Sequence, residues 1–123
     1  MGAPKEINAA LIASLPDEGP VIMVNMLNLR DRETYKRYSE ATMPLIKARG
    51  GTVIWAGNGE GVAFGNAEAD CWDYFVLVRY PSRAAFLEMM DSPDYAAANV
   101  HREQAVSRHV IVATTETYSK MKA

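Results

Sequence analysis

The residues of this sequence that could do chemistry are a few polar side chains set into otherwise apolar or helical segments. Asn25 interrupts the apolar run 21–29, and a buried amide without hydrogen-bond partners costs about 1–3 kcal/mol. Tyr38 follows Tyr35 at helical spacing, which places two hydroxyls on one helix face. Arg102 could hold a carboxylate through two parallel hydrogen bonds. These residue types indicate a binding site for a small aromatic or carboxylated molecule.

Each of these side chains also has a structural interpretation that needs no ligand. Asn25 could bond the neighbouring backbone or a bulge, and Tyr38 could be a core ring with a satisfied hydroxyl. Arg102 could form an ion pair with an acidic residue, either Asp31 or a residue near Glu103. The sequence leaves both interpretations open for all three residues.

The further candidates for ligand contact are three side chains, His101, Trp72 and Arg79. Histidine is the side chain whose ordinary pKa lies near neutrality, and the sequence has two, His101 on a predicted helix and His109 at the start of a predicted strand. Trp72 could form an aromatic wall of a cleft. Arg79 lies in an apolar strand, where it could point towards a ligand or be a plain charge at the strand end.

Length and composition exclude several classes of function. The 123 residues are 49% hydrophobic and 23% charged, which is typical of one soluble globular domain. With 13 basic and 15 acidic side chains the net charge is -2, so we expect neither a nucleic-acid partner nor a membrane partner. The lone Cys71 fits a reducing cytoplasm, which is the expected location. No metal-ligand spacing or phosphate-binding motif is legible, so we expect no metal and no cofactor.

Apolar spacing, helix caps and glycine turns predict the elements that position these residues. Strands are expected at 21–29, 71–80 and 108–115, and the extended pieces 52–56 and 61–64 form either a hairpin or one long strand with a bulge. Helices are expected at 5–15, from a cap at Asp31 to 49, after a cap at Ser82, and at 93–104. Gly50 and Gly51 should end the second helix, and Pro44 within it predicts a kink or break near Met43.

The order of these elements predicts a ferredoxin-like α+β fold. Without the first helix it reads strand, helix, strand, strand, helices, strand, which is the split β-α-β pattern of one antiparallel sheet with helices on one face. The strand 21–29 is apolar on both of its faces, although helices can cover only one of them. A second sheet packed on the other face would bury it, so the pattern favours a homodimer.

Several segments resemble, in order and spacing, the small bacterial domains of the family DUF1330. They are 20–30, Tyr35 with Tyr38, Gly50-Gly51, Tyr80-Pro81-Ser82 and Ser92-Pro93-Asp94-Tyr95. The resemblance covers roughly residues 20–115 and implies the dimeric α+β barrel superfamily, in which two ferredoxin-like protomers close their sheets into one barrel. We therefore expect an N-terminal helical extension at 1–19, a DUF1330-like domain at 20–115 and a C-terminal tail at 116–123.

The resemblance implies a fold more than an activity, because the superfamily contains cofactor-free monooxygenases, isomerases, haem-degrading enzymes and stress proteins. The first hypothesis is a cleft between sheet and helices that binds a small molecule, with or without cofactor-independent oxygenase or isomerase chemistry. Its candidate ligand-binding residues are Asn25, Tyr38, Trp72, Arg102, His101 and Arg79. The second is a non-catalytic dimeric module whose polar residues satisfy one another.

A third hypothesis, haem binding or degradation, also comes from the resemblance. Haem-degrading relatives use an Asn on the first strand, a Trp on a later strand and a His on a following helix. This chain offers Asn25, then Trp55 or Trp72, then His101 in that order, without the local motifs. The sequence therefore leaves open whether the protein is an enzyme.

Overall fold

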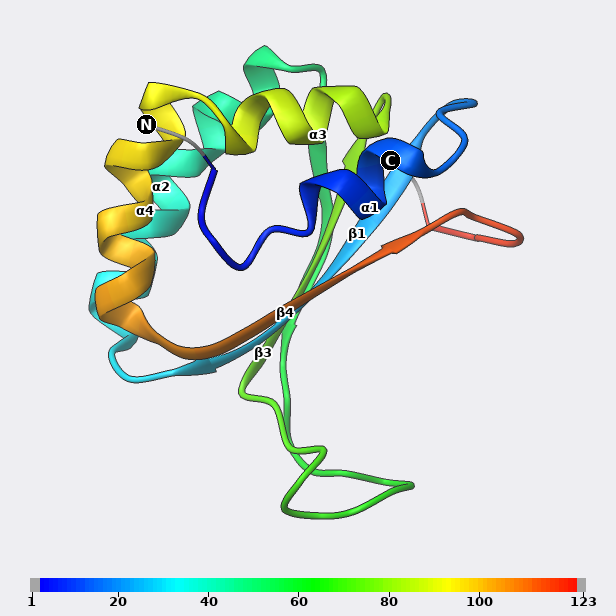
Figure 1. Cartoon of the computed structure of the whole chain (residues 1–123). Helices are drawn as coiled ribbons and strands as arrows, with labels where there is room; N and C mark the ends of the chain where they lie inside the picture. The colour runs from blue at the N-terminus through cyan, green and yellow to red at the C-terminus, as the bar shows by residue number, and fades with distance from the viewer. Residues whose placement is uncertain (1–2, 122–123) are drawn as a thin grey trace.

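A computed structural model describes residues 3–121 as four helices on one side of a twisted four-stranded sheet (Figure 1). In chain order the elements are α1 (Ala9–Ser14), β1 (Val21–Leu29), α2 (Arg32–Ala48), β2 (Thr52–Asn58), β3 (Tyr74–Tyr80), α3 (Arg83–Met90), α4 (Pro93–Ala105) and β4 (Val106–Thr114). The strand order is β2-β3-β1-β4, and every neighbouring pair is antiparallel. This is the predicted ferredoxin-like α+β arrangement.

Local capping signals set the helix boundaries as predicted. The Asp31 side chain accepts a hydrogen bond from the backbone N–H of Glu33 at the start of α2. Ser82 and Ser92 cap α3 and α4 in the same way. After α2 the chain turns through Gly50, whose φ of 77° lies in the left-handed region that glycine adopts without strain.

The break predicted at Pro44 is wrong, because α2 continues across it as far as Ala48. Proline lacks the N–H that would bond the carbonyl of Glu40, one turn earlier. Pro44 and Glu40 both lie on the exposed side of the helix, where water can satisfy that carbonyl. The buried side, with Thr42 and Ile46, packs on the sheet without interruption.

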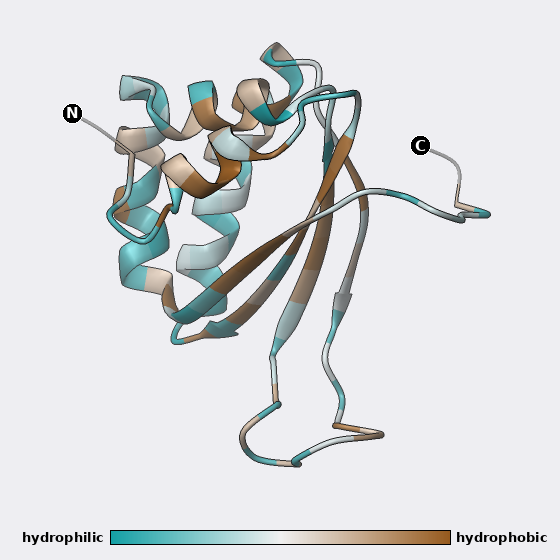
Figure 2. Ribbon diagram, turned by 45° about the vertical axis from the view of Figure 1, so that its right-hand side comes forward, coloured by the Kyte–Doolittle hydropathy of each residue, from teal (hydrophilic) through white to brown (hydrophobic). Residues whose placement is uncertain are grey.

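The strand predicted at 61–64 is also wrong, and the strand predicted from residue 71 begins only at Tyr74. Residues 59–73 form a loop that projects from one end of the sheet (Figures 1 and 2). Within it the Asn66 side chain accepts hydrogen bonds from the backbone N–H groups of Glu68 and Ala69, and Asp70 accepts one from the Asn66 backbone. These local bonds stabilise a turn in place of a strand.

The first helix is shorter than the predicted 5–15. It begins only at Ala9, because the preceding residues form a separate turn in which the Ile7 N–H bonds the Pro4 carbonyl. Its six residues include none that is buried. The helix α1 and the turn before it therefore lie on the protein surface.

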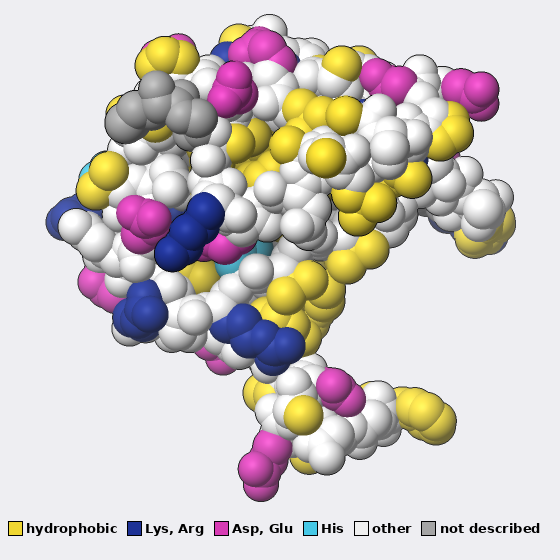
Figure 3. Space-filling model, in the orientation of Figure 1, with side chains coloured by type: hydrophobic (Ala, Val, Ile, Leu, Met, Phe, Trp, Pro, Cys, Tyr) yellow, Lys and Arg dark blue, Asp and Glu magenta, His cyan; other side chains and the backbone are white. Residues whose placement is uncertain are grey.

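The two faces of the sheet have different environments, as the strand pattern predicts. On the helix side, Val21, Met23 and Leu27 are buried. On the other side no helix within residues 3–121 covers the sheet (Figure 1). Apolar residues of that side, here called the open face, include Val24, Met26, Phe75, Leu77, Val110 and Val112. Hydropathy colouring shows apolar stretches along the strands (Figure 2), and hydrophobic side chains gather on the flank of the sheet above the projecting loop (Figure 3).

Within residues 3–121 no helix combines the length and apolar character needed to cross a bilayer.

Candidate functional site

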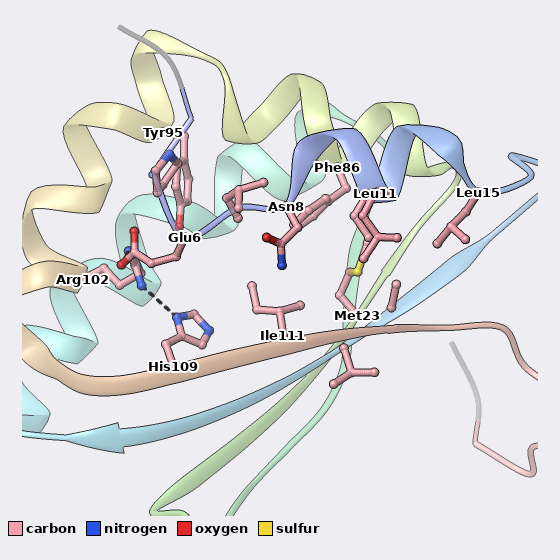
Figure 4. Close-up of a pocket in the computed structure, with 15 residues that line it drawn as sticks. Glu6, Asn8, Leu11, Leu15, Met23, Phe86, Tyr95, Arg102, His109 and Ile111 are labelled. Atoms are coloured by element: carbon pink, nitrogen blue, oxygen red, sulfur yellow. Dashed lines mark hydrogen bonds and ion pairs between the residues drawn. The ribbon is translucent and has the colours of Figure 1, made fainter.

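A cavity of about 310 Å³ lies between the N-terminal segment and the helix side of the sheet (Figure 4). Its outer wall consists of Pro4, Glu6, Ile7, Asn8, Leu11, Ile12 and Leu15. Its inner wall includes the side chains of Met23, Phe86, Ile111 and Ala113, and one end is closed by Tyr95, Arg102 and His109. The cavity is therefore an apolar chamber with a polar end.

Arg102, on α4, is the charged group at the polar end, and its side chain is only 8% exposed. Its Nε–H donates to Asn99 Oδ1 at 2.6 Å, and its Nη2 donates to Glu6 Oε2 at 3.1 Å. Its Nη1 lies 3.2 Å from His109 Nδ1. A buried guanidinium needs partners for its N–H groups and its charge, and here Glu6 is the acidic partner.

The hydrogen bonds around His109 define its protonation. Asn25 Nδ2 donates to the carbonyls of Met23 and Val76, which leaves its Oδ1 to accept from His109 Nε2 at 2.9 Å. Nδ1 of His109 then carries a lone pair that accepts from Arg102. Burial is the main cause that lowers the His109 pKa to about 4, and the charge of Arg102 lowers it further. His109 is therefore a neutral ring fixed between Asn25 and Arg102.

A second cavity, of about 230 Å³, lies deeper between α2 and the sheet. Met23, Phe86, Tyr95, His109 and Ile111 line both cavities and so form the wall between them. In the second cavity the hydroxyls of Tyr38 and Tyr95 are 2.8 Å apart, and the Tyr35 ring packs against the rings of Tyr38 and Tyr74. Burial raises the pKa of Tyr38 and of Tyr95, so both hydroxyls stay protonated.

Periodicity explains why these residues meet. Alternation along β1 places Asn25 on the same side as Met23, facing the helices. On β4, His109 alternates with Ile111, and Ile111 lies opposite Asn25. On α4, a start at Pro93 places Tyr95 and Arg102 two turns apart on the buried side of the helix. The site is thus built where the buried side of α4 faces β1 and β4.

Three of the predicted site residues come together and three do not. Asn25 and Arg102 are joined through His109, whereas Tyr38 bonds Tyr95, which lines both cavities together with His109. Trp72, His101 and Arg79 line neither cavity.

The three separate residues have other surroundings. Trp72 lies in the projecting loop, where the Arg108 guanidinium sits 4.1 Å from the ring centroid. His101 lies on α4 next to Arg102 in sequence but does not share its contacts. Arg79 alternates with buried neighbours on β3, so it points to the open face, and it forms an ion pair of 3.6 Å with Glu116.

Sequence reasoning missed two members of the site. The predicted acidic partners of Arg102, Asp31 or a residue near Glu103, are wrong, because the partner is Glu6. Nothing in the sequence signals this contact, since Glu6 lies in a short polar turn. His109 was recognised as a histidine but not as a site residue, although its alternation with Ile111 and Ala113 places all three on one face.

The described residues of the site do not form a set of metal ligands. Within residues 3–121 no three or more His, Cys, Asp or Glu side chains group closely enough to hold a metal ion. Both ring nitrogens of His109 are already engaged, by Asn25 and by Arg102.

Fold and site together define a ferredoxin-like α+β protein with a cavity between sheet and helices. The family model described as "Domain of unknown function (DUF1330)" matches residues 20–115, so the chain belongs to that family. A search of curated proteins finds no match.

Among solved structures, the chain is similar to RPA0582, a protein of unknown function from Rhodopseudomonas palustris, with 29% identity and a TM-score of 0.83, covering 97% of this chain and 100% of that one. A dimeric ferredoxin-like protein of unknown function from Bacteroides fragilis has 14% identity and a TM-score of 0.56, covering 80% and 98%. A protein from Bacteroides thetaiotaomicron, provisionally named an antibiotic biosynthesis monooxygenase, has 14% identity and a TM-score of 0.55, covering 85% and 95%. The last two likenesses bear on the fold.

Proposed function

We propose that the protein binds a small, mostly apolar molecule in the cavity between the N-terminal segment and β4, with the polar group of the ligand at Arg102. The observation that carries this proposal is a buried guanidinium, held by Asn99 and His109, at one end of an apolar chamber. A few fixed polar groups on apolar walls are typical of ligand sites, and a volume of about 310 Å³ suits a small ligand. An aromatic or carboxylated molecule fits this description.

The hydrogen bonds favour binding over catalysis as the primary role. A cofactor-independent oxygenase or isomerase needs a base that can take a proton from its substrate. Two groups that line this end of the cavity could act as a base, Nδ1 of His109 and the Glu6 carboxylate, and each accepts a hydrogen bond from Arg102 instead. An enzymatic form of the proposal would require the ligand to replace one of these bonds.

We also propose that a second copy of the chain covers the open face. The support is the row of apolar side chains there, with Val112 46% exposed, and the dimeric state of the similar protein from Bacteroides fragilis. Burying such a face removes apolar surface from water, which favours association of two copies. Light scattering of the purified protein tests this directly, because a monomer at micromolar concentration would contradict it.

Binding can be tested with N-phenyl-1-naphthylamine, a neutral apolar dye whose fluorescence rises in apolar surroundings. We expect saturable binding to the native chain. Ala113→Phe fills the inner wall of the cavity and should weaken binding by about tenfold or more, an effect of at least about 1.4 kcal/mol. Ala97→Phe, the same change at an exposed site on α4, is the matched control. Absence of dye binding, or equal binding by folded Ala113→Phe, would contradict the proposal.

A further inference from the structure

We propose that the polar group of the ligand is a carboxylate that replaces Glu6 on Arg102, and that residues 3–15 are the displaceable wall through which the ligand enters. This inference rests on the proposed function, because it assumes that the cavity is a binding site. It adds the chemical class of the ligand and the route by which the ligand reaches the cavity.

The charge of Arg102 determines which ligands can take the place of Glu6. Among residues 3–121, Glu6 is the acidic side chain that pairs with Arg102, at 3.1 Å, while Asn99 and the neutral His109 contribute no negative charge. Leaving a buried cation without a counter-charge is strongly unfavourable. A neutral ligand would leave that cost unmet, whereas a carboxylate would restore both the charge and the hydrogen bond.

The two partners of this ion pair differ in exposure. The Arg102 side chain is 8% exposed, whereas that of Glu6 is 54% exposed. A hydrogen bond to its own backbone N–H, with a smaller contribution from Arg102, keeps the Glu6 pKa below its ordinary value, so the carboxylate is ionised at neutral pH. On release, Glu6 returns to water with little rearrangement, while Arg102 stays buried and needs a new anion. Release of Glu6 from Arg102 therefore costs Glu6 little, whereas the vacated Arg102 selects an anionic ligand.

The wall that carries Glu6 is lightly attached. No residue of α1 is buried, and Leu11 is 58% exposed although it borders the cavity. Beyond α1 the chain is fixed again by Asp17, which accepts a hydrogen bond of 2.8 Å from the Arg83 backbone N–H. Before α1, the wall is held by the Glu6–Arg102 ion pair and by Ala3 and Ile7, which are partly buried against the core. Release of the ion pair would leave only these apolar contacts to hold the wall as far as the Asp17 anchor. Figure 4 shows Glu6 and Arg102 at one end of the cavity and Leu11 and Leu15 at the other.

The lining limits the ligand to one carboxylate. Beyond the polar end, the lining is apolar apart from Asn8, and no second cationic side chain is among the lining residues. A second carboxylate would therefore lie against apolar side chains without a partner. A monocarboxylate with a short alkyl or single-ring body matches both the lining and the volume of about 310 Å³.

The test uses octanoate and its neutral counterpart octanamide as competitors of N-phenyl-1-naphthylamine, with the full chain and two variants. Glu6→Gln removes the internal carboxylate and keeps the shape of the side chain. Glu18→Gln is the same change at an exposed residue outside the cavity. In the native chain octanoate should compete about tenfold better than octanamide, because only octanoate replaces Glu6.

The Glu6→Gln variant gives the decisive comparison. It should bind octanoate about three to ten times more tightly than the native chain, because the fraction of protein with a free Arg102 increases. Its affinity for octanamide should change less than about twofold, and Glu18→Gln should match the native chain. An unchanged or weaker affinity of Glu6→Gln for octanoate would overturn the inference. Failure of the dye to bind the native chain would instead refute the proposed function.

Hydrogen exchange provides a second readout that does not depend on a variant. The backbone N–H groups of Ile7, Ile12 and Leu15 are bonded within the wall. Octanoate should accelerate their exchange in the native chain, because binding displaces the wall, whereas octanamide should not. Slower exchange with octanoate would mean that the ligand closes the wall instead of displacing it, and would overturn the inference.

Discussion

Acidification should destabilise the protein between about pH 6.5 and pH 4, because the fold holds His109 in its neutral form. Burial, followed by the charge of Arg102, lowers the pKa of His109 from 6.5 to about 4. In the unfolded chain the ring takes up a proton near pH 6.5, so over this interval the unfolded state binds more protons than the folded state. The stability that the neutral ring contributes is therefore complete above pH 6.5 and is lost as the pH falls towards 4.

The size of the effect follows from the lowered pKa. A difference of one in pKa corresponds to about 1.36 kcal/mol, so a fall from 6.5 to about 4 corresponds to about 3 kcal/mol of unfolding free energy. This is a large share of the 5–15 kcal/mol typical of a folded domain. The structure explains the cost of protonation, because a proton on Nδ1 would replace the lone pair that accepts from Arg102 and would place two cations 3.2 Å apart.

Urea unfolding at about pH 7, 5.5 and 4 tests this with two matched variants. His109→Gln keeps one donor and one acceptor but cannot gain a charge. His101→Gln is the same change at the other histidine, which lies outside the cavity. The native chain and His101→Gln should lose about 3 kcal/mol more than His109→Gln, since carboxylate titration is common to all three. An equal loss in His109→Gln, or an NMR titration of folded His109 near pH 6.5, would refute the reasoning.

Three further substitutions test other parts of the structure. Tyr95→Phe removes the hydroxyl bonded to Tyr38 and should lower the unfolding free energy by about 1–2 kcal/mol in urea, whereas unchanged stability would mean that water replaces the bond. Asp17→Ala removes the acceptor for two backbone N–H groups at the start of α3 and should cost about 1 kcal/mol in thermal unfolding, with Glu18→Ala as a silent control. Val24→Asp places a charge on the open face and should convert the proposed dimer into monomers by light scattering; a variant that remains dimeric would place the interface elsewhere.

Local signals were sufficient to predict most of the secondary structure. Caps at Asp31, Ser82 and Ser92 act within three residues of their own position, so they can be read without knowledge of the fold. The order of the predicted elements indicated a sheet with helices on one side, and the apolar residues on both faces of β1 indicated that a second copy covers the other side. Residues 61–64 do not form the expected strand. A run of four apolar or glycine residues is a weak strand signal, and the adjacent turn is stabilised by hydrogen bonds to the Asn66 side chain.

Part of the candidate site could be predicted from the sequence, and part depends on the tertiary structure. From the sequence alone, an amide within an apolar strand and polar residues at helical spacing selected Asn25, Tyr38 and Arg102 as candidates, together with three residues that lie elsewhere, Trp72, His101 and Arg79. Only the tertiary structure decides that Arg102 pairs with Glu6, 96 residues away, and that His109 lies between Arg102 and Asn25. Apolar periodicity repeats along the chain, so it can be recognised in the sequence. A single long-range ion pair or side-chain hydrogen bond depends on where two elements meet in space, so the sequence contains no pattern that predicts it.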